Sequence, residues 1–190
     1  MYRATVTLRS NAPYSCSRQH RTEFKEGESH EAYEQRTWRE KCNYHKESGE
    51  VFIPQMAFKQ AMDSSAKRLS IPDPDNKRAT FTKNFLSDVI CETHVYIGIT
   101  KDKIKKQVIN ANVDGVRGSG KRVERWLPQV SQWEGKTSFI IMDERITQEI
   151  FERVLYTAGS SIGVGQFRAE KGGMNGRFEI VGKIKYESLT

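Results

Sequence analysis

Two long stretches with few core-forming residues interrupt the apolar segments of this 190-residue chain, at residues 14–49 and 101–135. The remaining segments either alternate apolar and polar residues, as strands do, or repeat apolar residues at helical spacing. Long stretches without a core pattern are usually functional or disordered when they occur in a compact domain. We therefore expect one α+β domain over residues 1–190, with a small core and two long insertions.

The core elements are expected in the order strand, helix, strand, strand, helix, strand. In the first strand, Ala4, Val6 and Leu8 alternate with polar residues. We expect Thr147 to cap the second helix and Gly159 to end it as the C′ residue. The expected elements are strands at residues 3–9, 89–99, 137–142 and 178–186, and helices at residues 54–70 and 146–158.

This order of elements is typical of the ferredoxin-like fold, βαββαβ, which is also the fold of RNA-recognition modules (RRM). Two helices cover one face of its four-stranded antiparallel sheet. The other face is the surface on which RNA-recognition modules stack bases. We therefore expect a free sheet face that is available to unpaired bases.

Basic residues are concentrated in the second insertion. The chain holds 31 Lys and Arg against 24 Asp and Glu, a net charge of +7, which favours a polyanionic partner. Charge binds the backbone of any strand, and an aromatic face can stack on any base. We therefore predict nucleic-acid contact here, with a solvated hairpin as the alternative. The candidate residues are Arg117, Lys121, Arg122, Arg125 and Trp126.

A glycine-rich loop is expected between the second helix and the last strand, at residues 159–177. Glycines allow backbone N–H groups to come close to a phosphate. Three basic residues, Arg168, Lys171 and Arg177, accompany the glycines. We predict that this loop contacts nucleic acid, and a flexible connector is the alternative interpretation.

The first insertion is nearly balanced in charge. Its basic candidates for nucleic-acid contact are Arg18, Arg36 and Arg39, and a flap held by salt bridges is an equally good interpretation. Two pairs in it have spacings that suit metal ligands, and zinc could fold a segment that lacks a core. Because their spacing matches no standard zinc finger, a metal site remains an alternative to the expectation of no metal. The pairs are Cys16 with His20 and Cys42 with His45.

Catalysis is not expected. His20, His30 and His45 lie in the first insertion, and a histidine is the usual general base of a metal-independent ribonuclease, which we keep as an alternative. Gly120 and Lys121 resemble the end of a phosphate-binding loop, but the hydroxyl residue that would hold a metal is missing. We therefore expect a binding protein without a cofactor.

Cysteine usage and hydropathy limit where such a protein works. The odd number of cysteines, three, argues against a disulfide framework and favours a reducing compartment. No apolar run approaches the roughly 20 residues that cross a bilayer. Residues 1–10 also lack the apolar region of a secretory signal. We expect a cytoplasmic protein that does not associate with membranes.

Three segments of the chain resemble the repeat-associated mysterious protein (RAMP) superfamily, especially the backbone subunits of CRISPR effector complexes. The first strand leads through Ala12-Pro13-Tyr14 into a long insertion. Residues 50–62 are similar to the family's strand, Ile-Pro and helix segment, and residues 158–180 to its glycine-rich loop. Similar short proteins in phages and prophages suggest that this chain is a stand-alone phage or prophage relative of the superfamily.

The resemblance implies a protein that binds single-stranded RNA or DNA and oligomerises along the strand, within a nucleoprotein complex. The family's pattern would place Lys59, Arg168, Lys171 and Arg177 near phosphates. It would make residues 113–128 a thumb that reaches a neighbouring subunit. Some backbone subunits cleave RNA with an Asp in the first insertion, which this insertion lacks. A phage mimic that blocks a host nucleoprotein complex is a further alternative.

Overall fold

The computed structural model describes residues 1–16, 18–112, 120 and 122–189. Its central sheet has the strand order β11-β1-β10-β6, with all neighbours antiparallel. The strands are β1 (Tyr2–Ser10), β6 (Val89–Cys91), β10 (Glu134–Ile141) and β11 (Phe178–Ser188). Helix α2 (Gln55–Leu69) lies between β1 and β6 in the chain, and α4 (Gln148–Thr157) lies between β10 and β11. The predicted α+β class is confirmed.

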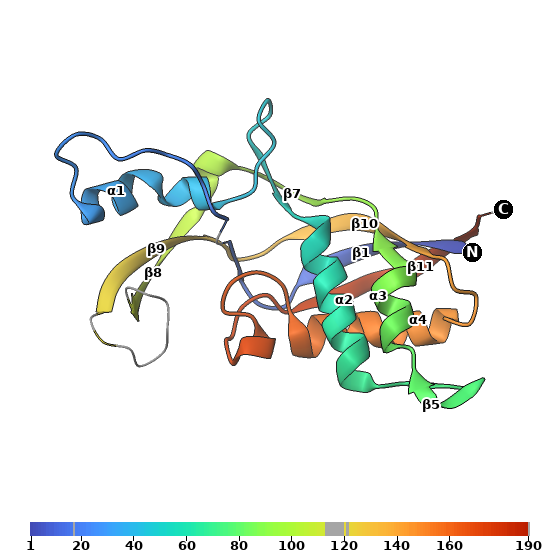
Figure 1. Cartoon of the computed structure of the whole chain (residues 1–190). Helices are drawn as coiled ribbons and strands as arrows, with labels where there is room; N and C mark the ends of the chain where they lie inside the picture. Colours follow the sequence, from blue (N-terminus) through green and yellow to red (C-terminus); the bar gives the residue numbers. More distant parts are fainter. Residues whose placement is uncertain (17, 113–119, 121, 190) are drawn as a thin grey trace.

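The core forms where the two helices pack on one face of this sheet (Figure 1). Ala4, Val6 and Leu8 of β1 point into it, as their alternation predicts. The facing positions of the helices are fully buried. Burying each such side chain stabilises the fold by roughly 1.5–3 kcal/mol. The largest of these helix side chains are Phe58 and Met62 of α2 and Phe151 and Leu155 of α4.

Helix α4 begins as predicted but ends differently. The Thr147 hydroxyl accepts the backbone N–H of Ile150 and so caps the first turn. The chain then continues into a π-helical turn, η3 (Ala158–Ile162), and the positive φ of +77° belongs to Gly163 rather than Gly159. Gly159 is needed for another reason. A Cβ there would lie 2.2 Å from the carbonyl oxygen of Phe178, so a side chain would push β11 off the helix.

The strand-like residues 89–99 form two strands rather than one. After β6, the polar residues Glu92, Thr93 and His94 turn the chain away from the central sheet. Arg3 holds the Glu92 carboxylate at 2.8 Å, and His94 Nδ1 accepts the first N–H of α2, from Gln55, at 3.1 Å. The chain then pairs as β7 (Val95–Thr100) with β3 (Glu50–Ile53). The sequence pattern also missed helix α3 (Thr82–Asp88) and the hairpin β4 (Pro72–Asp73) and β5 (Asn76–Thr80).

The two insertions pack against each other at one end of the molecule (Figure 1). The first contains β2 (Tyr14–Ser15), α1 (His30–Thr37) and the 3₁₀ turn η1 (Trp38–Lys41). The second begins with the 3₁₀ turn η2 (Lys101–Lys103) and forms a hairpin of β8 (Lys105–Asn112) and β9 (Arg122–Val130), to which β2 adds a third strand. The expectation that the first insertion lacks a core is wrong, because four buried apolar residues among those described in it extend the core cluster. They are Tyr14, Cys16, Trp38 and Cys42.

A carboxylate buried between the insertions holds them together. Glu34 of α1 is 7 % exposed. Its Oε1 accepts the Lys41 ammonium and the backbone N–H of Trp126 in β9, the latter at 2.8 Å. The same ammonium donates to the Trp126 carbonyl at 2.9 Å. Both charges and the strand's polar groups are therefore satisfied only when α1 lies on β9.

The free face of the central sheet differs from the predicted base-stacking surface. Alternation places Arg3, Thr5, Thr7 and Arg9 of β1 on it. The arginines are paired there, Arg3 with Glu92 at 2.8 Å and Arg9 with Glu179 at 2.5 Å. Within the described strands β1, β6, β10 and β11, aromatic side chains fall on the core side or the sheet end rather than on this face. The expectation of a bare stacking surface is therefore wrong.

None of the helices in the described ranges is both long enough and apolar enough to span a membrane.

Candidate nucleic-acid interface

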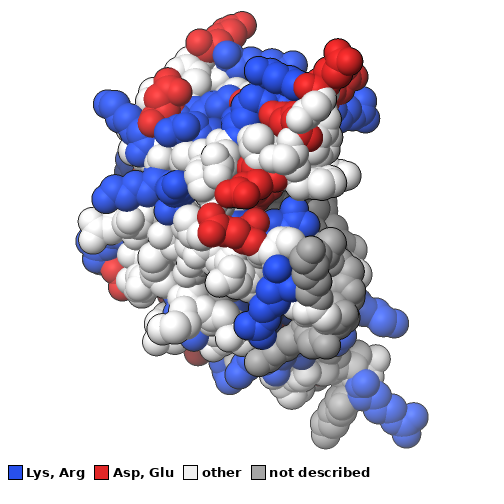
Figure 2. All heavy atoms as spheres, turned by 90° about the vertical axis from the view of Figure 1, so that its left-hand side faces the viewer, with Lys and Arg blue, Asp and Glu red and all other residues white. Residues whose placement is uncertain are grey.

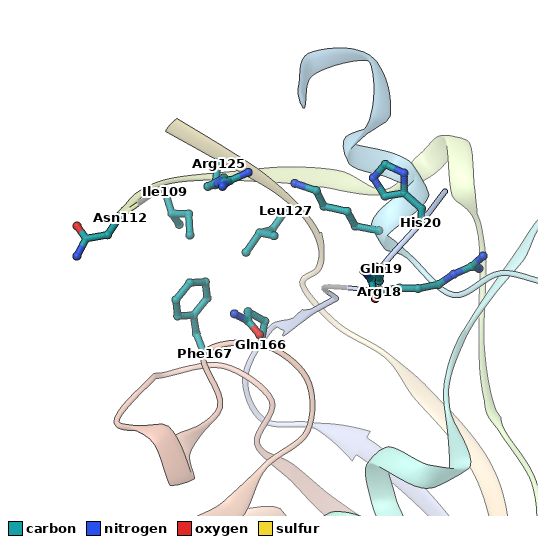
Figure 3. A pocket seen from close by; sticks show the side chains of 10 residues that line it. Arg18, Gln19, His20, Ile109, Asn112, Arg125, Leu127, Gln166 and Phe167 are labelled. Carbon is teal, nitrogen blue, oxygen red and sulfur yellow. The ribbon is translucent and has the colours of Figure 1, made fainter. Parts of the chain in front are cut away.

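A cavity of about 460 Å³ lies where the first insertion, the β8–β9 hairpin and the glycine-rich loop meet (Figure 3). We call it the basic cleft. It combines cationic, amide and apolar side chains from segments that are far apart in the chain. Its lining residues are Arg18, Gln19, His20, Lys41, Ile109, Asn112, Arg125, Leu127, Gln166 and Phe167.

Phe167 forms one wall of the basic cleft in a strained conformation. Its φ of +55° is in the left-handed region, which costs a bulky residue about 1–2 kcal/mol. The loop enforces this conformation. The Phe167 carbonyl accepts the Asn175 N–H at 3.0 Å, and a Cβ on Gly173 would lie only 1.8 Å from the same oxygen. Phe167 is nevertheless 37 % exposed, so the strained backbone holds an aromatic residue in the cleft rather than in the core.

The opposite wall comes from the hairpin. Ile109 of β8 and Leu127 of β9 face the ring of Phe167 across the cleft (Figure 3). The Gln166 amide lies beside the ring, and Asn112 lies at the hairpin end of the cavity. An aromatic face opposite aliphatic side chains makes a slot that suits a flat, apolar ring with polar edges.

A polar network fixes the loop against the hairpin and so sets the width of this slot. Asn175 of the loop is buried, and its Nδ2 donates to Ser15 Oγ at 2.9 Å. Ser15 in turn donates to Gln107 Oε1 of β8 at 2.9 Å. The backbone N–H of Gln166 donates to the Ser15 carbonyl at 2.8 Å. Strand β2 is therefore the common support of both walls.

Three basic residues give the cleft its positive charge. Arg18 is exposed, its guanidinium carbon lies 5.9 Å from the centre of the Tyr44 ring, and Figure 3 shows the side chain pointing away from Phe167 and Leu127. Lys41 is bound by Glu34, and Arg125 Nη1 lies 3.9 Å from the same carboxylate. With one carboxylate against three cations, the cleft keeps a net positive charge.

His20 also lines the cleft and is neutral at pH 7. Burial lowers the pKa of its imidazole, and the neighbouring charge of Lys41 lowers this pKa further. Its Nδ1 accepts the Thr22 N–H at 3.4 Å. A neutral imidazole can donate one hydrogen bond and accept another.

The structure brings only part of the predicted set into the cleft, namely Arg18 and Arg125. Arg168 follows Phe167 but is paired with Glu170 at 2.9 Å, and Arg177 donates to the Ser160 carbonyl at 3.1 Å. Lys171 and Arg122 are exposed, on the loop and at the start of β9. Arg117 and Lys121 lie outside the described residues.

Four other predicted residues are engaged by neighbouring residues of the protein itself. Lys59 on α2 is 12 % exposed and binds Asp63 and the carbonyls of Phe85 and Leu86, so its ammonium supports the α2–α3 contact. Arg36 pairs with Glu28 at 2.7 Å, and the guanidinium carbon of Arg39 lies 4.3 Å from the centre of the Trp38 ring. Trp126 carries Lys106 Nζ 3.5 Å from its ring centre and lines a different cavity.

The structure does not bring the four suggested metal ligands together. Cys16 and Cys42 are buried with their sulfurs 2.9 Å apart, whereas His45 is exposed beside Ser48 and His20 lies in the cleft. The hydrogen bond with Cys42, followed by burial, raises the pKa of the Cys16 thiol well above its usual value. Zinc needs the thiolate, so this environment disfavours it. No group of three ligands occurs among the described residues.

Sequence reasoning missed Lys41 and both apolar walls of the cleft. Phe167 carried the most useful signal, because it is an aromatic residue placed among glycines and directly before an arginine. Ile109 and Leu127 carried none, since apolar residues in a hairpin usually indicate packing rather than a binding wall.

Neither a protein-family model nor a curated protein matches the chain. Solved structures share its fold. One is a chain in the structure of type III-B Cmr-beta bound to cognate target RNA, with a TM-score of 0.57, 14 % identity and 97 % of this chain covered. This chain spans 60 % of that chain's length. The other is Cmr6 from Pyrococcus furiosus, with a TM-score of 0.50, 12 % identity, and 95 % of this chain and 99 % of that chain covered.

These neighbours are RAMP-type CRISPR subunits, so the chain has a RAMP-like fold. At the level of the fold, the resemblance stated from the sequence is confirmed.

Proposed function

We propose that this protein binds single-stranded nucleic acid in the basic cleft, as a non-catalytic subunit similar to the backbone subunits of CRISPR effector complexes. The observation that carries the proposal is Phe167, whose strained backbone holds its ring in the wall of a cleft that contains Arg18, Lys41 and Arg125. Residues with strained backbone conformations cluster at functional sites, where the function depends on that conformation.

The cleft matches the two chemical parts of an unpaired nucleotide. A base fits between Phe167 and the aliphatic residues Ile109 and Leu127, and the amide of Gln166 is placed to bond its edge. Phosphates lie along the basic rim, where Arg18 contributes a side chain that already points outward. Stacking and charge both tolerate any sequence, so weak sequence preference is expected.

RNA is the first ligand to test, because one structural neighbour is a Cmr-beta chain in a structure with target RNA. We further propose that the βαββαβ core is ferredoxin-like, since its strand order and helix positions are those of that fold. Assembly of several copies along one strand belongs to the same proposal. A phage or prophage setting and a cytoplasmic location stay predictions.

A salt titration tests the proposal. We expect the affinity for a short single-stranded RNA to fall with salt, with a slope of about −0.7 in log–log form for each phosphate neutralised, hence roughly −1 to −2 for the cations of one cleft. Fluorescence anisotropy at several salt concentrations measures this slope. A duplex of the same length should bind more weakly, because its bases are already stacked. Affinity that is absent, or independent of salt, would contradict the proposal.

One observation favours a second candidate, a metal-independent endoribonuclease. His20 lies in the same cleft as Lys41, which is the pairing of imidazole and cation that such chemistry uses. Incubating RNA with the protein in a chelator tests it. Cleavage that leaves 2′,3′-cyclic ends and disappears in the His20→Ala variant supports a nuclease. Intact RNA supports the non-catalytic function.

A further inference from the structure

A second cavity, of about 790 Å³, separates α1 and its preceding loop from β9. We call it the aromatic groove. It shares Glu34 and Arg125 with the region of the basic cleft, but its other walls take no part in the proposed nucleic-acid site. The residues that define its chemistry are Phe24, Glu31, Tyr33, Glu124 and Trp126.

One wall of the aromatic groove exposes the apolar ring of Phe24, which Tyr33 and a hydrogen-bonded loop hold in place. Phe24 stacks on Tyr33 with the ring centres 3.8 Å apart, yet it is 49 % exposed. Two hydrogen bonds hold the loop that carries it. The Tyr33 hydroxyl donates to the Thr22 carbonyl at 2.7 Å, and the Arg36 guanidinium donates to the Glu23 carbonyl at 2.9 Å. These bonds hold the loop that presents the ring at the surface.

The opposite wall pairs an aromatic ring with a carboxylate. Trp126 of β9 donates its indole N–H to Glu124, which orients both side chains. Lys106 lies over the same indole ring, 3.5 Å from its centre. The chain's own cations thus already use these aromatic rings, since the Arg36 guanidinium carbon also lies 5.6 Å from the centre of the Tyr33 ring.

Carboxylates outnumber cations among the described residues that line the groove, although the chain carries a net charge of +7: they come from Glu31, Glu34 and Glu124, against Arg125. Glu34 is already paired with Lys41, so Glu31 and Glu124 are the carboxylates that face a ligand. Figure 2 shows carboxylates near the middle of this side of the molecule, with Lys and Arg around them. Such a cavity repels phosphates and attracts cations.

We propose that the aromatic groove binds an arginine side chain presented by a segment of a partner protein. A guanidinium is planar, so it can lie against the exposed ring of Phe24 while its N–H groups bond the carboxylates of Glu31 and Glu124. Lysine offers neither the flat face nor the paired donors. A second copy of this highly basic chain is the less suitable occupant, because two copies repel each other.

Short peptides test this proposal independently of nucleic-acid binding. Fluorescein-labelled Ser-Gly-Arg-Gly-Ser is compared with the same peptide carrying lysine or citrulline, the last being neutral but nearly the same shape as arginine. We expect the arginine peptide to bind in fluorescence anisotropy, the lysine peptide to bind more weakly and the citrulline peptide not to bind. Because the protein is positively charged overall, non-specific attraction does not produce this order.

Variants of the groove complete the test. Phe24→Ala and Glu124→Gln are each expected to weaken binding of the arginine peptide by about 2- to 30-fold, the range from an exposed to a desolvated cation–π contact. Tyr156→Ala, which removes an exposed aromatic ring on α4, is the control and should leave binding unchanged. Binding of the short RNA is expected to stay at the wild-type level in Phe24→Ala. Failure of the arginine peptide to bind would therefore not contradict the proposed nucleic-acid binding.

Three results would overturn the inference. The first is equal binding of the arginine and citrulline peptides. The second is competition of the RNA with the peptide for one site. The third is self-association of the free protein that Phe24→Ala abolishes, which would make a second copy the occupant. Phe24→Leu keeps an apolar contact on Tyr33, so loss of peptide binding in this variant also excludes simple unfolding of the loop as the cause.

Discussion

Replacing Phe167 by glycine is expected to weaken the binding of a single-stranded RNA by about 5- to 150-fold. This range follows from the roughly 1–3 kcal/mol that one aromatic–base stack contributes. The same change is expected to cost less thermal stability than Phe167→Ala, although both variants lose the packing of the ring. Glycine accepts the φ of +55° that strains Phe167, and this relief of about 1–2 kcal/mol offsets the backbone entropy cost of glycine, about 0.5–1 kcal/mol.

The comparison of two variants that lack the ring and differ in backbone strain makes this prediction specific. Fluorescence anisotropy gives the affinity, and thermal unfolding followed by circular dichroism gives the stability. Phe167→Ala is the matched control, because it removes the ring but keeps the strain, and it should weaken binding and lower stability together. Phe167→Trp should retain binding. If Phe167→Gly destabilises the fold while binding RNA normally, the ring serves packing and the proposed slot is wrong.

Replacing Glu34 by alanine is expected to lower the free energy of unfolding by about 3–5 kcal/mol. Removing one partner of a buried ion pair leaves the other charge uncompensated, and here the Lys41 ammonium remains against β9. The backbone N–H of Trp126 also loses its acceptor. Urea unfolding measures the loss, and we expect α1 and the hairpin to separate before the central sheet unfolds.

Glu31→Ala is the matched control for Glu34, since Glu31 is an exposed carboxylate on the same helix and should change stability by less than about 0.5 kcal/mol. A double variant, Glu34→Leu with Lys41→Met, should recover much of the stability, because apolar residues of similar volume can replace a buried ion pair. An equal, small effect of Glu34→Ala and Glu31→Ala would show that the two insertions are held by other contacts.

The parts of the fold that could be predicted are the strands and helices that bury a single face, because their apolar residues then repeat with a regular period. Strand β1 alternates because one face meets the helices, and α2 and α4 repeat at helical spacing because each buries a single stripe. The split of residues 89–99 depends on long-range partners, the Arg3 guanidinium and the Gln55 N–H, that no local pattern reveals. The docking of the insertions depends in the same way on Glu34.

The candidate site, too, could be predicted only in part from the sequence. Basic residues can be counted in a sequence, and Arg18 and Arg125 do reach the cleft. Whether a cation is available depends on its neighbours, and Lys59 is bound by Asp63 one helical turn away. The free sheet face was expected to stack bases by analogy with RNA-recognition modules, yet it carries the Arg9–Glu179 ion pair. The aromatic surface lies instead on a loop, where strain rather than periodicity marks it.

The most direct test of the central claim is to map where a bound strand touches the protein. A single-stranded RNA is cross-linked to the protein by ultraviolet light, and the modified peptides are identified by mass spectrometry. We predict cross-links at Phe167 and at His20, on the two sides of the basic cleft. Cross-links confined to the free face of the central sheet around β1, or to α2 around Lys59, with none in the cleft, would contradict the account.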